Sequence, residues 1–528
     1  MPVALPVLGA TSVRERRLWI GLLRVAAARG GIGRQLALVL PALLLTGCAW
    51  QAYRPAPLDL AGADAAAQLR TLDDEPTRAL LAAAGADLRA WPAVVWTRET
   101  LLLVLMERHP DMRAARARVA AAQARVPAAQ QAVNPDLSTR LENHSGRGSN
   151  GSPWSIGAGL QFAFNTQPLR AAQGALASAE ADEAEVAAGE VAWRLYRQLG
   201  DALLAVQATG EAATLAQDAV TLAQARIDSA EVRQRYGAAP ALEVQLAREA
   251  LLAARREQAL VGAAAAVAQA QLAQALALPV DALARVRLAS WPVLSPVDGG
   301  EGAGPDASTA RAIALQNRLD LARELALYEV AEASVRVEIA RQYPQVRLGP
   351  GLAWDQGDRI WQIGLSLPLA LLQRNEAGIA AAEARRAAQA QQLLARQAAV
   401  AGEVESARQR VIALVGPLLA SRSEADAADK YLALMQRQFD AGAADAASLI
   451  AARAVALQAR RLVQEATVAW RQAQWSLEAA LQAPLPAGGS PAHDADAAHA
   501  GDHGRQAHAH PAPGHSTDDA HAHGHPRP

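Results

Sequence analysis

The sequence of 528 residues is poor in cysteine and in aromatic side chains: it has one cysteine, Cys48, and only 4% aromatic residues. A single cysteine excludes a network of disulfide bonds within the chain. Neither sign of charge is in excess, because 51 basic and 52 acidic residues leave a formal net charge of −1. A chain without a basic excess lacks the electrostatic attraction that favours nucleic acid. We therefore expect no nucleic-acid partner.

Motifs of catalysis are missing as well. The sequence contains no phosphate-binding glycine loop and no nucleophile elbow. Its two histidines outside the C-terminal region, His109 and His144, are isolated from other catalytic residue types. We expect a protein that is not an enzyme and requires no cofactor.

The N-terminus has the pattern of a secretory signal. Six arginines between residues 14 and 34 precede an apolar run, Leu36–Leu45, which ends in Leu45-Thr46-Gly47-Cys48. This tetrapeptide resembles the lipobox of bacterial lipoproteins, in which the cysteine is acylated and becomes the first residue of the mature chain. Ala49 follows, and not the aspartate that often retains lipoproteins in the inner membrane, so the resemblance favours the outer membrane. The alternative is an ordinary signal followed by a buried free cysteine.

Two pairs of short segments alternate apolar side chains with polar or small ones. In residues 154–164, for example, Trp154 and Ile156 fall on one face of an extended chain, and Ser155 and Gly157 on the other. The four segments are residues 137–142, 154–164, 345–354 and 361–367. Such alternation over roughly ten residues is typical of a strand that crosses a bilayer between lipid and a lumen. We expect His144 on the lumen face of the first strand or in its loop.

Four such strands cannot close into a barrel. An open edge in lipid would leave backbone groups unpaired, at a cost of several kcal/mol each. After the signal, no apolar run is long enough for a membrane-spanning helix, so these strands are the only candidates for membrane spans. The pattern therefore predicts an oligomer in which other copies of the chain complete the barrel.

The remaining sequence is rich in alanine, leucine, glutamine, glutamate and arginine, which are strong helix formers. In the first half we expect helices over about 99–131, interrupted at His109-Pro110, then over 169–235 and, after a turn, over 241–278. The second half repeats this order over about 309–341, 376–438 (with a kink at Gly416-Pro417) and 444–481. The matching order and lengths indicate an internal duplication.

The ordered set of these signals resembles the TolC-type outer-membrane efflux proteins in their lipid-anchored form. The residues that carry the resemblance are His109-Pro110-Asp111-Met112-Arg113, Pro135 and Pro344 before the strands, Pro368-Leu369 with Arg374-Asn375, and the turns Arg235-Tyr236-Gly237 and Gln438-Phe439-Asp440-Ala441-Gly442. The resemblance implies a mostly α fold with membrane β-strands, in which three copies form a twelve-stranded β-barrel continued by a long α-helical barrel. An irregular segment girdles this helical tunnel.

The same resemblance implies a passive exit duct in the bacterial outer membrane, with its helical part in the periplasm. Its partners would be a periplasmic adaptor protein and an inner-membrane RND pump. The expected segments are a signal peptide (1–47), a lipid-anchored periplasmic segment (48–95), a first efflux repeat (96–278), a linker (279–306), a second efflux repeat (307–482) and a tail (483–528). One departure is Asn165-Thr166-Gln167-Pro168, expected to form a looser strand-to-helix turn than its counterpart in the second half.

Two helix-to-helix turns are the expected gate and adaptor contact, again by resemblance. They contain Tyr236 and Gly237 in the first half, and Phe439, Asp440, Gly442 and Asp445 in the second. In three copies Asp440 and Asp445 would form carboxylate rings near the periplasmic mouth, and such rings favour cations. The alternative for Asp445 is a helix cap. Both glycines are expected to serve the backbone turn itself.

The C-terminal tail is rich in histidine. Nine of the eleven histidines fall there: His493, His499, His503, His508, His510, His515, His521, His523 and His525. Their composition and irregular spacing indicate loose, weak binding of zinc, copper, cobalt or nickel, or else a merely solubilising tail. Together with Arg374-Asn375-Glu376-Ala377, which resembles the heavy-metal efflux branch, the tail favours metal cations as cargo. Drugs or other organic compounds are the alternative cargo, and a structural coiled-coil lipoprotein is the alternative to a duct.

Overall fold

The computed structural model describes residues 52–92, 94–144, 153–164, 166–289, 304–355, 357–369 and 371–485. The chain divides into two compact units, residues 1–66 and 67–528. At the end of the first unit, an irregular segment leads into α3 (Leu60–Gln68), a helix without buried side chains whose last two residues fall in the second unit. The predicted signal, Cys48 and the histidines of the tail lie outside the described residues. All further elements belong to the second unit.

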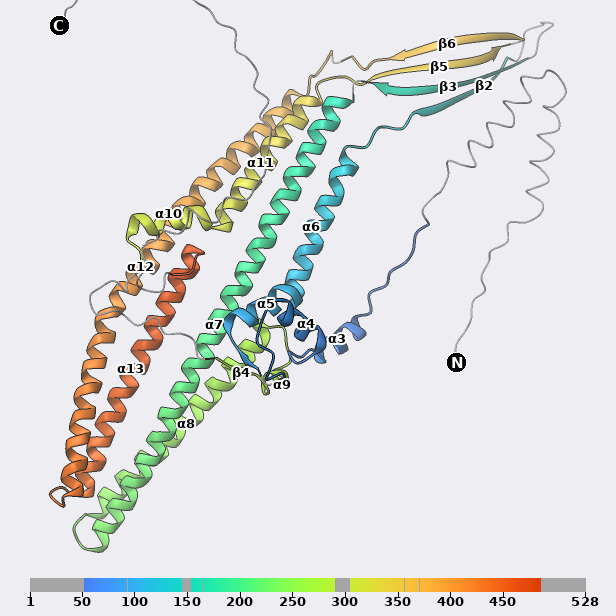
Figure 1. The fold of residues 1–528 in the computed structure, drawn as a ribbon. Helices are drawn as coiled ribbons and strands as arrows, with labels where there is room; N and C mark the ends of the chain where they lie inside the picture. Colours follow the sequence, from blue (N-terminus) through green and yellow to red (C-terminus); the bar gives the residue numbers. More distant parts are fainter. Residues whose placement is uncertain are drawn as a thin grey trace, which may run out of the picture. The chain divides into compact units, whose positions relative to one another are not determined.

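Two long helices dominate the second unit: α7 (Gln167–Arg235) has 69 residues and α12 (Glu376–Asp440) has 65. At 1.5 Å per residue, each is about 100 Å long. Each turns back into a shorter helix, α8 (Ala241–Ala275) after α7 and α13 (Ala446–Leu481) after α12 (Figure 1). The four helices predicted here are confirmed, and α12 continues through Pro417 without ending. None of the helices in the described part of the chain combines the length and the apolar character that a membrane span requires.

Shorter elements also belong to the second unit. They are α4 (Glu75–Ala83), α5 (Arg98–Arg108), α6 (Pro110–Ala129), α9 (Val280–Leu283), α10 (Ala307–Asn317), α11 (Leu319–Ala340) and the paired short strands β1 (Val95–Trp96) and β4 (Arg287–Leu288). Leu101 and Leu105 of α5 are buried against Leu199 of α7 and Leu272 of α8. The segment from α4 to α5 and the segment after α8 therefore share one hydrophobic core.

The single helix predicted over 309–341 is wrong, because it is divided at Arg318 into α10 and α11. Arg318 has extended backbone angles (φ −71°, ψ 115°), as His109 has between α5 and α6 (φ −65°, ψ 134°). Pro110 signals the first break, because proline disfavours helical angles in the preceding residue. The residue directly after Arg318 is Leu319 and not a proline. Its break is stabilised instead by the tertiary contacts of its own side chain.

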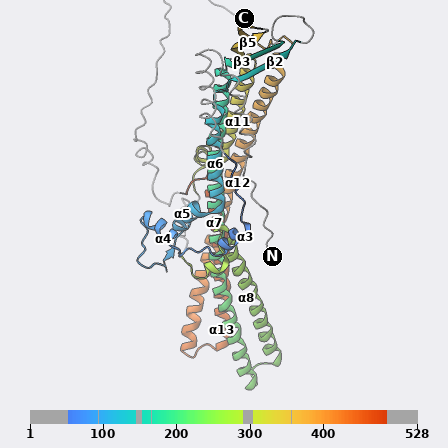
Figure 2. The same cartoon turned by 90° about the vertical axis from the view of Figure 1, so that its right-hand side faces the viewer.

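Those contacts join α11 to α13, which lie end to end between α7 and α12 (Figures 1 and 2). The guanidinium of Arg318 donates through Nη1 to the backbone oxygen of Ala480 at 3.1 Å, and the backbone N–H of Leu319 donates to Oε1 of Gln482 at 2.8 Å. Helix ends leave such backbone groups without an intrahelical partner. The junction pairs them, so two shorter helices fill the place of one long helix beside α7 and α12.

The remaining strands form one antiparallel sheet in the order β2-β3-β5-β6. They are β2 (Asp136–Asn143), β3 (Trp154–Phe164), β5 (Val346–Asp355) and β6 (Asp358–Ser366). The two hairpins are therefore neighbours, joined through β3 and β5. Within this sheet β2 and β6 each have one neighbouring strand, so each presents a free edge.

The two faces of the sheet differ in chemistry. The register places Leu141, Ile156 and Trp354 in one row, and all three are more than one-third exposed. On the other face, Gly159 and Gly351 lie opposite each other. The predicted strands and their alternation are confirmed, with apolar side chains exposed on one face and small or polar ones on the other.

The predicted difference between the two strand-to-helix turns is wrong. Residues 165–166 alone separate β3 from α7, whereas residues 367–375 separate β6 from α12. Pro168 lies in the first turn of α7, where its fixed φ suits a helix start. In the second half α12 begins only after Asn375, which adopts a left-handed conformation (φ 58°). The looser turn is therefore in the second half.

Gly200 allows α7 and α13 to pack closely together. A Cβ atom added to Gly200 would lie 2.0 Å from the ring of Trp475, whereas nothing lies within 4 Å of a Cβ at Gly210 in the same helix. We expect Gly200→Ala to destabilise the protein by about 1–3 kcal/mol through overpacking, and Gly210→Ala to stabilise it by about 0.5–1 kcal/mol through helix propensity. Denaturant unfolding of the purified proteins measures both. Equal stability of the two variants would contradict this packing.

Candidate functional site

The turn between α7 and α8 depends on a left-handed glycine. Gly237 has φ 74°, and the N–H of Ala238 donates to the carbonyl of Arg233 at 2.7 Å across the helix end. Nothing lies within 4 Å of a Cβ built on Gly237, so the backbone conformation, and not space, favours glycine here. Tyr236, which precedes it, is 84% exposed. An aromatic side chain is thus presented to solvent at the tip of the turn.

The turn between α12 and α13 repeats this geometry. Gly442 has φ 72°, and the N–H of Ala443 donates to the carbonyl of Gln438 at 2.8 Å. Phe439 is 38% exposed, so an aromatic ring is partly accessible to solvent beside this turn as well. Both expected turn glycines therefore occupy the conformation that the sequence reading assigned to them.

The two aspartates of the second turn differ in their contacts. Asp445 is the N-cap of α13: its Oδ1 accepts from the backbone N–H of Ser448 at 2.8 Å. Hydrogen bonds from the side chain and the backbone of Ser448 lower the pKa of Asp445. Asp440, the last residue of α12, is exposed, and within the described part of the chain its carboxylate accepts a hydrogen bond only from the side chain of Gln436, at 2.9 Å. The capping alternative is therefore what the structure shows for Asp445.

Each helix pair is tied internally close to its turn. In the α7–α8 pair, Arg233 donates to Glu243 at 2.6 Å. In the α12–α13 pair, Arg453 donates to Gln436 at 3.1 Å. Such bonds make each pair a unit on its own.

The two pairs are joined to each other farther from the turns, where α7 meets α13. Tyr196 donates to Glu478 at 2.6 Å, and Nε1 of Trp475 donates to Asp201 at 2.8 Å. Burial and the hydrogen bond to Glu478 raise the pKa of Tyr196. Nearest the turns, Gln464 donates to the carbonyl of Ala208 at 3.1 Å, and Arg471 pairs with Glu211 at 3.0 Å. From Gln464 on α13 and Glu211 on α7 to the turns, no hydrogen bond or ion pair joins the two pairs among the residues that the structure describes, although the charge of Arg233 acts on Asp445 and helps to lower its pKa.

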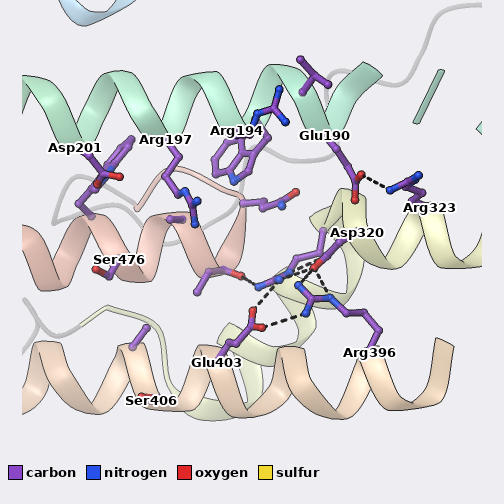
Figure 3. Close-up of a pocket in the computed structure, with 18 of the residues that line it drawn as sticks. Glu190, Arg194, Arg197, Asp201, Asp320, Arg323, Arg396, Glu403, Ser406 and Ser476 are labelled. Atoms are coloured by element: carbon purple, nitrogen blue, oxygen red, sulfur yellow. Dashed lines mark hydrogen bonds and ion pairs between the residues drawn. The ribbon is translucent and has the colours of Figure 1, made fainter. Parts of the chain in front are cut away.

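A hollow of about 850 Å³ lies between α7, α11, α12 and α13 (Figure 3). At its floor Arg318, which is 6% exposed, pairs with Asp320 at 2.5 Å and with Glu403 at 2.8 Å. Arg396 pairs with the same two carboxylates. Burial raises the pKa of Asp320, but the hydrogen bonds from Arg318 and Arg396 outweigh it and lower the pKa to about 2. The network is thus two arginines and two carboxylates, and its charges balance.

The sequence reading missed both this network and the contact between α7 and α13. One signal could have found the network: Arg318 precedes α11 and Asp320 lies in its first turn, as His109 precedes α6 and Asp111 lies in its first turn. The contact between α7 and α13 has no local signal, because its partners lie more than 250 residues apart in the sequence.

The two isolated histidines have structural contacts. Nδ1 of His109 accepts from the backbone N–H of Asp111 at 3.1 Å, so His109 caps α6 at the expected helix break. The interpretation of His144 as isolated is wrong: its Nε2 lies 2.8 Å from Oγ of Ser155, which in turn donates to Asp355. This contact joins the ends of β2, β3 and β5. Within the described ranges, no three His, Cys, Asp or Glu side chains gather as a metal site would require.

The two aspartates at the second turn make a matched pair for a stability test. We expect Asp445→Ala to lower the melting temperature at neutral pH, because the cap is lost. Asp440→Ala should leave it unchanged or slightly raised, because a carboxylate at a helix C-terminus is disfavoured by the dipole. The folded-state pKa of Asp445 is lowered from its ordinary value of 3.8, so its contribution is present above that value and lost as the pH falls through the lowered pKa. Thermal unfolding at neutral and acid pH tests this, and equal melting temperatures at neutral pH would contradict it.

Comparisons with known proteins agree with this architecture. The family model described as "Outer membrane efflux protein" matches residues 101–278 and 311–482. A search of the curated proteins found no match.

Solved structures share the fold. The chain is similar to the outer membrane protein VceC from Vibrio cholerae, with 17% identity over 73% of this chain and 96% of VceC, and a TM-score of 0.58. The outer-membrane channel OprN is 18% identical over 82% of this chain and 98% of its own, with a TM-score of 0.60. The CmeC outer membrane channel of Campylobacter jejuni is 12% identical over 74% and 87%, with a TM-score of 0.57. The resemblance to TolC-type proteins and the mostly helical fold with few strands are thereby confirmed. The family match spans more than half of the chain, so the chain belongs to the outer membrane efflux protein family, whose members are channels and not enzymes.

Proposed function

We propose that this chain is the exit duct of a tripartite efflux system, working with a periplasmic adaptor protein and an inner-membrane RND pump. The observation that carries the proposal is the four-stranded sheet, which is apolar on one face and free at both edges, in a chain of this family. The protein performs no chemistry in this role. It provides a continuous path through which the pump drives its cargo.

In the proposed assembly three copies contribute four strands each to a twelve-stranded barrel in the outer membrane. Pairing β6 of one copy with β2 of the next satisfies the backbone groups at both free edges. A barrel of more than eight strands leaves space for an interior channel. Residues 96–278 and 307–482 act as two repeats in it, which is supported by the recurring order of helix, two strands, long helix and return helix.

The helix turns form the periplasmic mouth and the adaptor contact in this proposal. Each helix pair is bonded internally, and the described hydrogen bonds between the two pairs end at Gln464 on α13 and Glu211 on α7. In the proposed opening the two pairs separate between this level and the turns, against the attraction between Arg233 and Asp445. Asp440 is the proposed pore-facing carboxylate. Its position at the C-terminus of α12 offers no benefit to the helix, which favours a role in the pore. Asp445 is occupied by capping.

We further propose that Cys48 carries the lipid anchor of an outer-membrane lipoprotein. The support is the sequence Leu45-Thr46-Gly47-Cys48 at the end of a signal-like segment. Mass spectrometry of the mature N-terminal peptide should find an acylated Cys48, and Cys48→Ser should abolish the acylation. An unmodified Cys48 in the mature protein would contradict the proposal.

Heavy-metal cations are the proposed cargo class, and the nine tail histidines support it. Neutral imidazole is a good ligand for zinc, copper, cobalt and nickel. The tail would collect such ions weakly in the periplasm, without acting as a fixed site. Drugs or other organic compounds remain the competing cargo.

A deletion strain tests this cargo. Growth is measured on zinc, cobalt, cadmium, nickel, copper and silver, with a panel of drugs alongside. The deletion is complemented with the full chain and with a chain that ends after Pro486. We expect sensitivity to particular metals, restored fully by the whole chain and less by the shortened one.

Each other outcome has a defined meaning. Sensitivity to drugs with normal metal tolerance would refute the metal cargo and leave a duct for organic compounds. Equal rescue by both chains would assign the tail no part in export. Two results together would refute the duct itself: normal growth of the deletion strain on every compound, and absence of the protein from the outer membrane fraction of the parent strain.

A further inference from the structure

A small hollow of about 240 Å³ lies beside the junction of α5 and α6. Its lining comes from three stretches that are distant in sequence: residues 70–72, residues between 104 and 113, and residues 276–278 after α8. Leu72, Leu105 and Leu276 line the hollow and are buried in the core that α5 shares with α7 and α8. Part of its wall is therefore apolar and is held in place by that core.

Four charged side chains also line the hollow, and two of them are already paired. Arg108 binds Asp74 at 2.6 Å, and Glu107 binds Arg116 at 2.8 Å. Neither Asp74 nor Arg116 lines the hollow. Because each of these ion pairs is neutral as a whole, the net charge of the hollow depends on the other two side chains.

These other two side chains, Arg70 and Arg113, are both positive and both unpaired. Neither makes a side-chain hydrogen bond or an ion pair with any residue in the described part of the chain. Arg70 is half-buried, whereas Arg113 is exposed. Arg70 borders a neighbouring hollow as well, but its charge acts on His109, so its guanidinium lies near that imidazole. The hollow therefore has two positive charges that no carboxylate of the described chain neutralises.

His109 adds a buried donor to the same hollow. Its side chain is only 8% exposed, and it lines the hollow. Because Nδ1 accepts from the backbone N–H of Asp111, the proton of the neutral ring is on Nε2. Within the described part of the chain, Nε2 has no hydrogen-bond partner. The Nε2–H group is thus available to a ligand in the hollow.

The surroundings keep the imidazole neutral at neutral pH. Burial lowers the pKa of His109, and the charges of Arg70 and Arg194 lower it further. Asp111 acts in the opposite direction, but it is itself paired with Arg194 at 3.2 Å. His109 is therefore a fixed hydrogen-bond donor here and not a third positive charge.

We propose that this hollow binds a small carboxylate that carries a short apolar group. Arg70 and the Nε2–H of His109 hold the carboxylate, since the planar donors of arginine match its two oxygens. The apolar group lies against Leu72 and Leu105. A volume of about 240 Å³ is below the range of roughly 300–1,000 Å³ that drug-sized ligands occupy, so the ligand is small.

The lining residues select this class of ligand. Two unpaired arginines repel a metal cation. Inorganic phosphate would leave the apolar wall without a contact, and a neutral molecule would leave Arg70 without a counter-charge. The site goes beyond the proposed duct and does not depend on it, because a single copy of the chain supplies every lining residue.

The probe for binding is 4-methylpentanoate, a carboxylate with a branched apolar chain. Saturation-transfer NMR titrations use the detergent-solubilised full chain, with detergent alone as the blank. We expect 4-methylpentanoate to bind at least about tenfold more tightly than 4-methylpentanamide, which has no charge, because an arginine–carboxylate bond is lost. Acetate should also bind at least about tenfold more weakly, because it has almost no apolar surface to bury.

Two variants test the two donors. Arg70→Gln should weaken the binding of 4-methylpentanoate at least about tenfold, because a charged donor is lost. His109→Asn should weaken it about three- to tenfold, because the imidazole donor is lost while asparagine still caps α6. The matched control is Arg78→Gln on α4, which removes an exposed arginine outside the hollow and should bind the probe as the unaltered protein does.

Unfolding curves of all the proteins show that each variant is folded. N-acetyl-leucine distinguishes two sources of the same chemistry: binding as tight as that of 4-methylpentanoate supports a peptide C-terminus as the ligand, and much weaker binding supports a free short-chain acid. Any of three results would overturn the site: no binding of 4-methylpentanoate to the unaltered protein, equal binding of the amide, or unchanged affinity in folded Arg70→Gln.

Discussion

The pairing of backbone groups at the two free edges of the sheet is the constraint on which the rest of the structure depends. β2 and β6 each have a strand on one side only, in a sheet whose apolar face is exposed. In lipid, each unpaired N–H or C=O group costs several kcal/mol. In the proposed duct, other copies of the chain pair these edges, and the helices that continue from the strands form the wall of the same assembly.

The second constraint is continuity along the long helices, because different shorter helices lie beside α7 and α12 near the sheet and near the turns. α7 and α12 run through, while α11 and α13 meet end to end between them. The junction is made by Arg318, whose side chain reaches the end of α13 and two carboxylates. The same junction borders the hollow between these helices.

Local signals predicted most of the fold. Alternation identified the strands, helix formers identified the long helices, and glycines with φ above +70° at residues 237 and 442 end them at the expected turns. The break at Arg318 and the contact of Gly200 with Trp475 could not be predicted in this way, because both depend on residues distant in sequence. Asp445 was weighed correctly as a cap because capping is a local interaction.

The oligomeric state of the protein in the outer membrane tests the central claim most directly. Native mass spectrometry of the chain, extracted from the outer membrane in mild detergent, measures it. The proposed twelve-stranded barrel, with four strands from each copy, predicts a complex of three copies that resists dissociation until it is heated. A stable monomer, with its apolar sheet exposed and its edges unpaired, would contradict the account.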